Sequence, residues 1–175
     1  RLIREPFSFN DVYLTIDGTL QEIAERALDH ALEQLHARSG DVVFLDSRNG
    51  EILAMASRLA DGGTSASALL TPFEPGSTAK LFTAAALLML GRVDSTDTVD
   101  PEGGRWMMPL PGKRNPVREI RDAHAEHEPL TLARTIEVSS NIGIIKFAGR
   151  LSVTEQFDML RDFGFGTMTG VEVPV

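Results

Sequence analysis

The stretch PFEPGSTAKLFTAAALLMLG, residues 72–91, opens on a short polar segment and continues as the most apolar run of the chain. Apolar side chains at residues 81–90 would surround a helix axis, and a helix that is apolar on all sides is buried. The run therefore predicts a buried helix from Ser77 to Leu90, ended by Gly91. A serine can start such a helix, but the start does not need the lysine that follows one turn later, Lys80.

Ser77 and Lys80 are three residues apart, so their side chains share a face in the first helical turn. A serine hydroxyl needs a base to become a good nucleophile, and a lysine can be that base when burial lowers its pKa. The positive end of the helix would disfavour the ammonium and favour an oxyanion. The alternative is structural, with Ser77 capping the helix and Lys80 reaching solvent. S-x-x-K alone is weak, because about one arises by chance in a chain of this length.

Ser139-Ser140-Asn141 is the second candidate segment. It interrupts two predicted helices, one capped by Thr131 and running to about Val138, the other an apolar stretch over residues 142–151. A polar turn between helices is the simpler interpretation. However, S-x-x-K followed about sixty residues later by S-x-N, at Ser139 and Asn141, matches a set known from penicillin-binding proteins and serine β-lactamases.

The N-terminal part of the chain predicts a strand, a helix and a hairpin. Residues 12–16 are typical of a short strand, and Asp17 can cap a helix whose apolar stripe runs from Leu20 to Leu35, with Gly40 as its stop. Two apolar runs, residues 42–45 and 52–56, flank Asn49-Gly50. An Asn-Gly pair tolerates positive φ, so it indicates a hairpin turn.

The remaining segments give weaker predictions. Residues 57–76 are small and polar and are expected to form a loop, and residues 92–129, rich in proline, are expected to be irregular and surface-like. Ser152 or Thr154 is predicted to open a last helix that ends at Gly164 and Gly166. Three apolar side chains of this helix are expected to point inward: Phe157, Leu160 and Phe163.

Composition excludes several classes of function. The 175 residues are 42% apolar and 24% charged, which is globular, and the net charge of −8 argues against a nucleic-acid partner. The absence of cysteine removes disulfides, thiolate catalysis and cysteine-bound metals. We expect no metal and no cofactor, and surface positions for the four histidines. These are His30, His36, His124 and His127.

The longest apolar run, residues 81–90, is too short to span a bilayer, and no signal peptide is visible. The chain begins at Arg1 rather than methionine and ends at residue 175 without a terminal element. We therefore expect it to be a piece of a longer protein.

Beyond the two motifs, most of residues 11–175 resembles the transpeptidase domain of a penicillin-binding protein of the class B type. The resemblance is carried by five stretches: YLTIDGTLQEIAERAL, GDVVFLDSRNGEILAMAS, FEPGSTAKLFTAAALL, EPLTLARTIEVSSNIGIIKFA and FGFGTMTGVEVP. They resemble, in order, the entry into the family's first helix, its first hairpin, the nucleophile helix, the S-x-N segment and the stretch that follows it.

The resemblance implies a mechanism. Ser77 would attack the carbonyl between two D-alanines of a peptidoglycan stem peptide, with Lys80 taking the serine proton. Ser139 would relay a proton toward the leaving amine, and Asn141 would bind the substrate amide and help to hold Lys80. An amine of a second stem peptide would then release the acyl group as a cross-link. β-Lactam antibiotics would acylate Ser77.

The resemblance also implies the fold and the place of action. The fold is α/β, of the α+β kind, namely a β-lactamase/transpeptidase-like fold: a five-stranded antiparallel sheet with helices on both faces, plus a helical subdomain. Residues 1–16 would be a linker or entry strand, and residues 17–175 the N-terminal part of the domain. The parent protein would be anchored by an upstream transmembrane helix, would act on the extracytoplasmic face of the bacterial membrane, and would join a wall-synthesis complex.

One family motif is missing from the sequence. No Lys-Thr-Gly or similar triplet occurs at any of the three lysines, which are Lys80, Lys113 and Lys146. In the family that triplet lies on a later strand that completes the oxyanion hole. We therefore expect a truncated fold that has the hairpin and the helical part but lacks the C-terminal strands. By itself this piece should be inactive, and its unpaired sheet edge should favour self-association.

Two other functions share the motifs. A serine β-lactamase would need a further base to activate the deacylating water, and no glutamate can be placed in that role. A β-lactam sensor domain, or an inactive scaffold of the same fold, would need no turnover at all.

Overall fold

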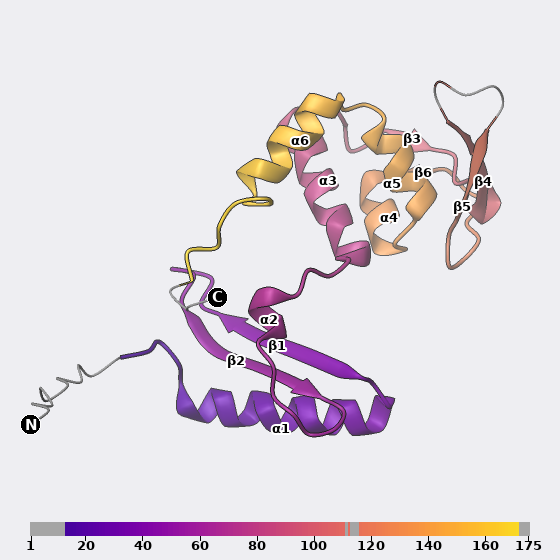
Figure 1. Cartoon of the computed structure of the whole chain (residues 1–175). Helices are drawn as coiled ribbons and strands as arrows, with labels where there is room; N and C mark the ends of the chain where they lie inside the picture. The colour runs from indigo at the N-terminus through magenta and orange to yellow at the C-terminus, as the bar shows by residue number, and fades with distance from the viewer. Residues whose placement is uncertain (1–12, 111, 113–115, 172–175) are drawn as a thin grey trace, which may run out of the picture. The chain divides into compact units, whose positions relative to one another are not determined.

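A computed structural model describes residues 13–110, 112 and 116–171 of the chain. The chain divides into two compact units, with the boundary in the sequence between Phe73 and Glu74 (Figure 1). The predicted linker or entry strand falls largely outside the described residues, because residues 1–12 are not among them. The same holds for residues 172–175 at the other end.

The first unit begins with α1, Gly18–Leu35, which starts as predicted. The Asp17 carboxylate accepts a hydrogen bond from the Leu20 backbone N–H at 2.9 Å and so caps the helix. The predicted stop at Gly40 is wrong, because α1 ends at His36, which adopts a left-handed conformation with φ 49°. Gly40 serves packing instead. A Cβ at this residue would lie 2.7 Å from Leu28 Cδ1, so glycine allows α1 to approach the strand closely.

The predicted hairpin is confirmed. It consists of β1, Ser39–Leu45, and β2, Ile52–Leu59, which pair antiparallel, with α1 lying alongside (Figure 1). Because β2 runs to Leu59, the expected loop begins later than predicted, and it contains the short helix α2, Ser67–Leu70.

The strand predicted at residues 12–16 is wrong for the described residues 13–16, which form no strand. They are tied to β2 by the Thr15 hydroxyl, which donates to the Ile52 carbonyl at 2.6 Å. The next hydrogen bond joins the Asp17 N–H to the Leu53 carbonyl at 2.9 Å. The β-branched Thr15 and Ile16 favour an extended backbone, but two hydrogen bonds to β2 do not make a third strand of the hairpin sheet.

The second unit opens with a 3₁₀ turn, η1, Gly76–Thr78, followed by α3, Ala79–Met89. The predicted helix is therefore confirmed, and Gly91 follows it at φ +60°, as a C-terminal glycine should. The prediction of burial on all sides is wrong. One face of α3 is buried, with Leu87 at 0% exposure, while Leu81 and Met89 are 57% and 72% exposed.

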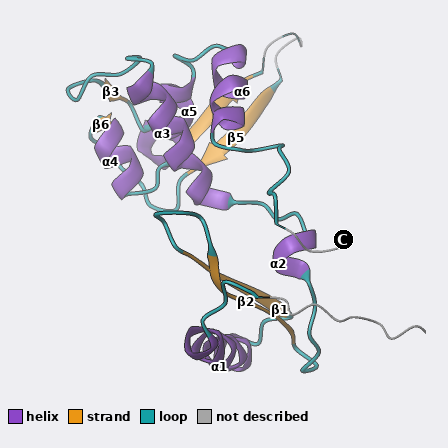
Figure 2. Ribbon diagram, turned by 90° about the vertical axis from the view of Figure 1, so that its left-hand side faces the viewer, coloured by secondary structure: helices purple, strands orange, loops and turns teal. Residues whose placement is uncertain are grey.

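The segment expected to be irregular contains a second hairpin. Two strands, β4, Arg105–Pro109, and β5, Val117–Arg121, pair antiparallel with Trp106 opposite Ile120 (Figure 2). The 3₁₀ turn η2, Glu102–Gly104, precedes them. Two further short strands, β3, Thr98–Val99, and β6, Leu130–Thr131, also pair antiparallel. The prediction of an irregular segment is wrong because its described prolines lie outside the ladder interiors. Pro109, for example, ends β4, and Pro101 precedes η2.

Three helices complete the second unit: α4, Leu132–Glu137, α5, Asn141–Ala148, and α6, Val153–Asp162. Thr131 caps α4 as predicted, and Ser140 caps α5. Of the two predicted caps for α6, Ser152 is the one used, in a reciprocal capping box with Glu155. The left-handed Gly164, φ +90°, follows the helix C-terminus.

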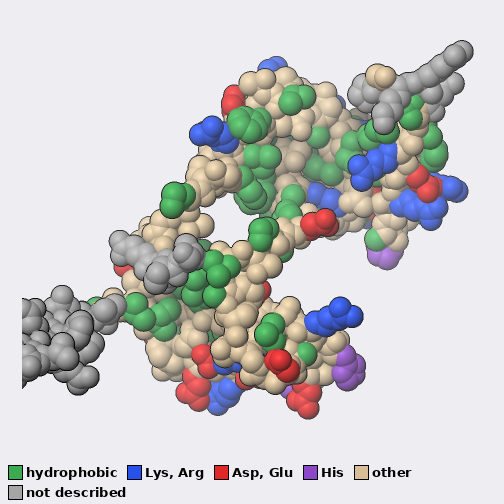
Figure 3. Space-filling view, viewed as in Figure 1, with side chains coloured by type: hydrophobic (Ala, Val, Ile, Leu, Met, Phe, Trp, Pro, Cys, Tyr) green, Lys and Arg blue, Asp and Glu red, His purple; other side chains and the backbone are tan. Residues whose placement is uncertain are grey.

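The core of the second unit joins α3 to the helices after it. Its buried residues are Ala84, Ala86, Leu87, Val93, Leu132, Ile144, Phe147, Leu151 and Met159. The prediction of three inward side chains on α6 is wrong, since Phe157, Leu160 and Phe163 are all exposed and Met159 is the buried one. Hydrophobic side chains reach the surface of both units (Figure 3). None of the described helices has the length and apolar character needed to cross a membrane.

Candidate active site

The turn before α3 presents Ser77. Gly76 has φ +57°, a left-handed conformation that L-residues rarely adopt, and no atom crowds the position of its missing Cβ. Glycine is therefore used here for its backbone conformation and not for space. Ser77 lies next in the 3₁₀ turn and is exposed. The residue at the N-cap of α3 is Thr78, and its side chain makes no capping bond. Ser77 is thus not the helix cap that the structural alternative required.

The loop between α4 and α5 brings the second motif to the first. The Ser139 hydroxyl donates to Ser77 Oγ at 3.0 Å and accepts from Lys80 Nζ at 3.0 Å. Lys80 Nζ also donates to the Ser139 backbone carbonyl at 2.5 Å. Among the described residues no hydrogen bond joins Lys80 directly to Ser77. The three side chains therefore form a line in which Ser139 lies between the other two.

Ser139 has an unusual backbone. Its φ of +55° places it in the left-handed region, which is rare for a non-glycine residue. In this conformation both its carbonyl and its hydroxyl meet the Lys80 amine. Holding such a residue costs about 1–3 kcal/mol and requires support from the surrounding structure.

The Lys80 amine has a perturbed proton affinity. Burial lowers the pKa of Lys80 below its usual range, while the nearby negative charge of Asp122 opposes part of that shift. The direction is the one a general base needs. Lys80 is only partly buried in the structure, so the amine is not fully withdrawn from solvent.

Asn141 is the first residue of α5 and follows Ser139 by two positions in the sequence. Its side-chain amide donates to the Arg121 carbonyl at the end of β5, at 2.7 Å. The hydrogen bond to Lys80 that the resemblance implied is not formed among the described residues, where Lys80 Nζ instead donates to the carbonyl and the hydroxyl of Ser139. A hollow of about 330 Å³ adjoins Asn141, lined by Arg118, Glu119, Ile120, Arg121, Asn141, Ile144 and Ile145.

Asp122 is the residue that the sequence analysis missed. Its carboxylate accepts hydrogen bonds from the Ser140 hydroxyl at 2.6 Å and from the backbone N–H groups of Asn141 and Ile142 at 2.5 and 3.1 Å. The partners lie eighteen to twenty positions away in sequence. Local pattern carries no signal for such a contact, since it depends on how the second hairpin packs.

The close packing of α4 on α5 fixes the loop between them. A Cβ at Gly143 would lie 2.7 Å from Thr135 Oγ1 and 2.8 Å from its Cγ2. Thr135 is fully buried, so it has little room to move. Glycine at this position therefore lets the two helices approach closely around Ser139.

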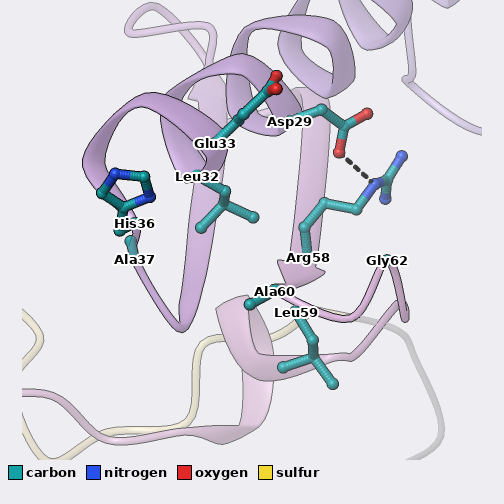
Figure 4. Close-up of a pocket in the computed structure, with 9 residues that line it drawn as sticks. All are labelled: Asp29, Leu32, Glu33, His36, Ala37, Arg58, Leu59, Ala60 and Gly62. Atoms are coloured by element: carbon teal, nitrogen blue, oxygen red, sulfur yellow. Dashed lines mark hydrogen bonds and ion pairs between the residues drawn. The ribbon is translucent and has the colours of Figure 1, made fainter.

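A hollow of about 620 Å³ lies in the first unit, between the end of α1 and β2 (Figure 4). Arg58 crosses it and forms ion pairs with Asp29 at 3.1 Å and with Glu25 at 2.9 Å. The lining residues are Asp29, Leu32, Glu33, His36, Ala37, Arg58, Leu59, Ala60 and Gly62. It holds none of the candidate catalytic residues, and the charges of Arg58 and Asp29 are engaged in an ion pair.

The histidines occupy surface positions, as predicted, since His30, His36, His124 and His127 are all exposed. Within the described ranges, no group of three or more histidine, aspartate or glutamate side chains is placed to hold a metal ion.

Residues 40–175 match the family described as the penicillin binding protein transpeptidase domain, and the chain belongs to that family. Among curated relatives it is 32% identical to the probable peptidoglycan D,D-transpeptidase PbpC of Pseudomonas aeruginosa, over 99% of this chain and 31% of the relative. It is 30% identical to the probable peptidoglycan D,D-transpeptidase PenA of Neisseria gonorrhoeae, over 93% of this chain and 28% of the relative. The chain thus spans less than a third of the length of these two relatives.

Solved structures agree on the fold. The chain superposes on a structure described as a peptidoglycan glycosyltransferase from Burkholderia ambifaria with a TM-score of 0.80 and 32% identity, covering 93% of this chain and 48% of that one. It superposes on the TP domain of penicillin-binding protein 3 from Burkholderia pseudomallei with a TM-score of 0.79 and 31% identity, covering 92% and 45%. The predicted mixed α/β fold of a penicillin-binding transpeptidase domain is confirmed, over less than half of those chains.

Proposed function

We propose that the chain is part of a peptidoglycan D,D-transpeptidase that works through an acyl-serine intermediate on Ser77. One observation carries the proposal. Ser77, Ser139 and Lys80 come from motifs about sixty residues apart and form one hydrogen-bonded line, and burial lowers the pKa of Lys80. The relatives PbpC and PenA, each named a probable peptidoglycan D,D-transpeptidase, support the same reaction.

In the proposed reaction Ser77 Oγ attacks the carbonyl carbon between two D-alanines of a stem peptide. The C–N bond breaks, the terminal D-alanine leaves as an amine, and an ester to Ser77 forms. An amine of a second stem peptide then attacks the ester carbonyl, releasing Ser77 and forming the cross-link. The backbone N–H of Ser77, in η1 just before α3, is one donor to the oxyanion of each step.

The geometry supports a proton route through Ser139. Because Ser139 Oγ is 3.0 Å from both Ser77 Oγ and Lys80 Nζ, Ser77 can pass its proton to Ser139 as Ser139 passes its own to the neutral Lys80 amine. The reverse transfer from the resulting ammonium, again through Ser139, protonates the departing amine. Lys80 is the base and Ser139 the relay.

Asn141 is proposed to bind the amide of the substrate. Its side-chain N–H₂ group is held by the Arg121 carbonyl, which orients the side chain, and its side-chain oxygen makes no hydrogen bond with any described residue. That oxygen can accept a hydrogen bond from a substrate N–H. The role of Asn141 in holding Lys80 stays a prediction.

The setting of the whole protein is also proposed from the family. The substrates are peptidoglycan stem peptides, and β-lactams are the inhibitors that acylate Ser77. The site of action is the extracytoplasmic face of the bacterial membrane, with an anchor and partner proteins of wall synthesis. Since the 175 residues contain no Lys-Thr-Gly triplet, this polypeptide by itself should be acylated little or not at all.

The test is labelling of the full-length protein by a fluorescent penicillin. We expect stable labelling of the wild type and none of Ser77→Ala, whereas Ser95→Ala, an exposed serine outside the motifs, should label like the wild type. Labelling of Ser77→Ala at the wild-type rate would refute the nucleophile. Stable labelling without cross-linking of stem peptides would indicate a sensor, and rapid loss of the label a β-lactamase.

A further inference from the structure

Three hydrogen bonds tie the start of α5 to one carboxylate. Asp122 accepts from the Ser140 hydroxyl and from the backbone N–H groups of Asn141 and Ile142. We propose that Asp122 is a positioning residue for acylation: it holds the Ser139–Asn141 segment in the arrangement that places Ser139 between Ser77 and Lys80. The inference rests on the proposed function, because the reaction that Asp122 assists is the one proposed for Ser77.

Asp122 is itself fixed by the second hairpin. It follows β5 directly, and its own backbone N–H donates to the Gly104 carbonyl at 3.1 Å. The neighbouring Arg121 carbonyl accepts from the Asn141 side chain. The end of β5 therefore makes four hydrogen bonds to residues 140–142, three through Asp122 and one through Arg121. The β4–β5 hairpin acts as the support on which α5 begins.

Ser140 completes the support. It is 1% exposed, and its hydroxyl donates to Asp122 while it accepts from the Gly143 N–H at 2.8 Å. Both hydrogen-bonding capacities of this buried hydroxyl are thus used. Because Ser140 and Asn141 are held in this way, the residue just before them, Ser139, is kept in its left-handed conformation, which an L-residue would otherwise leave.

Asp122 also affects the charge of the site. Among the described residues it is the charged group that acts on the Lys80 ammonium, and it raises the pKa of Lys80 against the larger effect of burial. Removing the carboxylate charge should therefore have two separable results. The maximal acylation rate should fall because Ser139 is less well placed. The pH at which Lys80 becomes neutral should also fall, because the ammonium loses a favourable neighbour.

The experiment measures the acylation rate constant of the full-length protein by a β-lactam across pH for the wild type, Asp122→Ala and Asp122→Asn. The control is Glu128→Gln, which removes one exposed negative charge from the same loop. We expect Asp122→Ala to acylate about 10²-fold more slowly, the loss typical of a misplaced catalytic group. The isosteric Asp122→Asn should lose less and should shift the acidic limb of the profile to lower pH. Glu128→Gln should match the wild type.

A purely structural role predicts something else. Asp122→Asn would then lower the melting temperature and the yield of active protein, but the rate constant of the labelled fraction and its pH profile would equal those of the wild type. That outcome would overturn the proposal. If Asp122→Ala does not fold, the comparison of Asp122→Asn with Glu128→Gln decides by itself.

A second measurement separates this inference from the proposed function. The Lys80 ε-carbon can be titrated by NMR in ¹³C-lysine-labelled protein, with its signal assigned by its absence from Lys80→Arg. The pKa of Lys80 should be lower in Asp122→Asn than in the wild type and unchanged in Glu128→Gln. If neither the wild type nor any variant reacts with β-lactams, the proposed function fails. The titration still tests whether the Asp122 carboxylate acts on the Lys80 ammonium. An unchanged Lys80 pKa in Asp122→Asn would contradict the inference.

Discussion

A single serine joins the two motifs of the site. Ser139 offers both its hydroxyl and its backbone carbonyl to Lys80, and the same hydroxyl donates to Ser77. This double use depends on the left-handed backbone of Ser139. The hydrogen bonds that join Ser77, Ser139 and Lys80 therefore depend on the backbone conformation of Ser139, which α4 and α5 flank.

Lys80→Arg tests the base at the residue scale. A guanidinium stays protonated at all working pH values, so it cannot accept the serine proton although it can fill similar space. We expect β-lactam acylation of the full-length protein to fall about 10²–10⁴-fold, the usual contribution of a general base. Lys146→Arg, which keeps its ion pair with Glu102 outside the site, is the matched control. Normal acylation of Lys80→Arg would show that the base has been wrongly assigned.

Wild-type acylation should also follow the charge of Lys80. Because burial lowers the pKa of Lys80, the neutral amine forms at lower pH than an ordinary lysine would allow. The acylation rate should rise as pH rises through that lowered pKa and then level off.

At the scale of elements, the approach of α4 to α5 depends on Gly143. An alanine Cβ would lie 2.7 Å from Thr135 Oγ1, inside a fully buried contact. Gly143→Ala should therefore destabilise the protein by about 1–3 kcal/mol, as overpacking does. Chemical denaturation of the full-length protein measures this. Gly18→Ala, where nothing lies within 4 Å of the new Cβ, should be close to neutral.

A double variant sharpens that prediction. Thr135→Ala removes the two nearest of the three atoms that the new Cβ would meet, the third being Ser140 Oγ at 3.1 Å, so Gly143→Ala combined with Thr135→Ala should recover part of the lost stability relative to the sum of the single variants. If Gly143→Ala is as stable as the wild type, the two helices are not held at the contact described.

The start of α6 gives a pH dependence. The Arg92 guanidinium, followed by the N-cap hydrogen bonds with Ser152, lowers the pKa of Glu155 from 4.5 to about 2. A carboxyl whose pKa is lowered in the folded state stabilises that state above its ordinary pKa, and the contribution is lost as pH falls from 4.5 toward 2. The protection factors of the α6 amides against hydrogen exchange, which are corrected for the intrinsic effect of pH, should therefore fall as pH falls across this window.

Glu155→Gln is the control for α6. The glutamine cannot ionise, so α6 in this variant should exchange faster at neutral pH and should change less between pH 4.5 and pH 2 than in the wild type. If the exchange of the α6 amides depends on pH equally in the wild type and in Glu155→Gln, carboxylates other than Glu155 cause the loss of protection.

The sequence predicted those features whose signal is local. The caps at Asp17, Thr131 and Ser152 follow from side chains that bond three residues ahead, and the first hairpin follows from its Asn-Gly turn. Ser77, Lys80, Ser139 and Asn141 were recognisable by motif and order. The structure brings Ser77, Lys80 and Ser139 together.

Long-range packing was not predictable in the same way. The second hairpin was missed because its strands are short and flanked by proline, and Asp122 was missed because its partners lie on another element. The exposure of α3 and α6 was also missed. Periodicity shows which residues share a helix face, but only the packed structure shows which face is covered.

On the scale of the whole molecule, the 175 residues expose many large apolar side chains. In the second unit Leu81, Leu88, Met89 and Phe157 are all more than half exposed. In the first unit β1 pairs with β2 alone among the described strands, which leaves one edge of the hairpin free. Exposed apolar surface and free strand edges both favour association.

We therefore expect the 175-residue polypeptide, prepared alone, to self-associate. Sedimentation velocity over a range of concentrations should show a distribution that shifts to larger species as concentration rises. Charged substitutions on the exposed face of α3, such as Leu81→Glu with Leu88→Glu, should reduce the shift. A monomer that unfolds in one cooperative thermal transition would refute this expectation.

The central claim is that Ser77 becomes acylated. The most direct measurement is mass spectrometry of the full-length protein after brief exposure to penicillin, followed by digestion and sequencing of the modified peptide. The account predicts one added penicilloyl group, located on Ser77 within the peptide that contains Gly76-Ser77-Thr78. An adduct on any other residue, or an unmodified Ser77 in folded full-length protein, would contradict it.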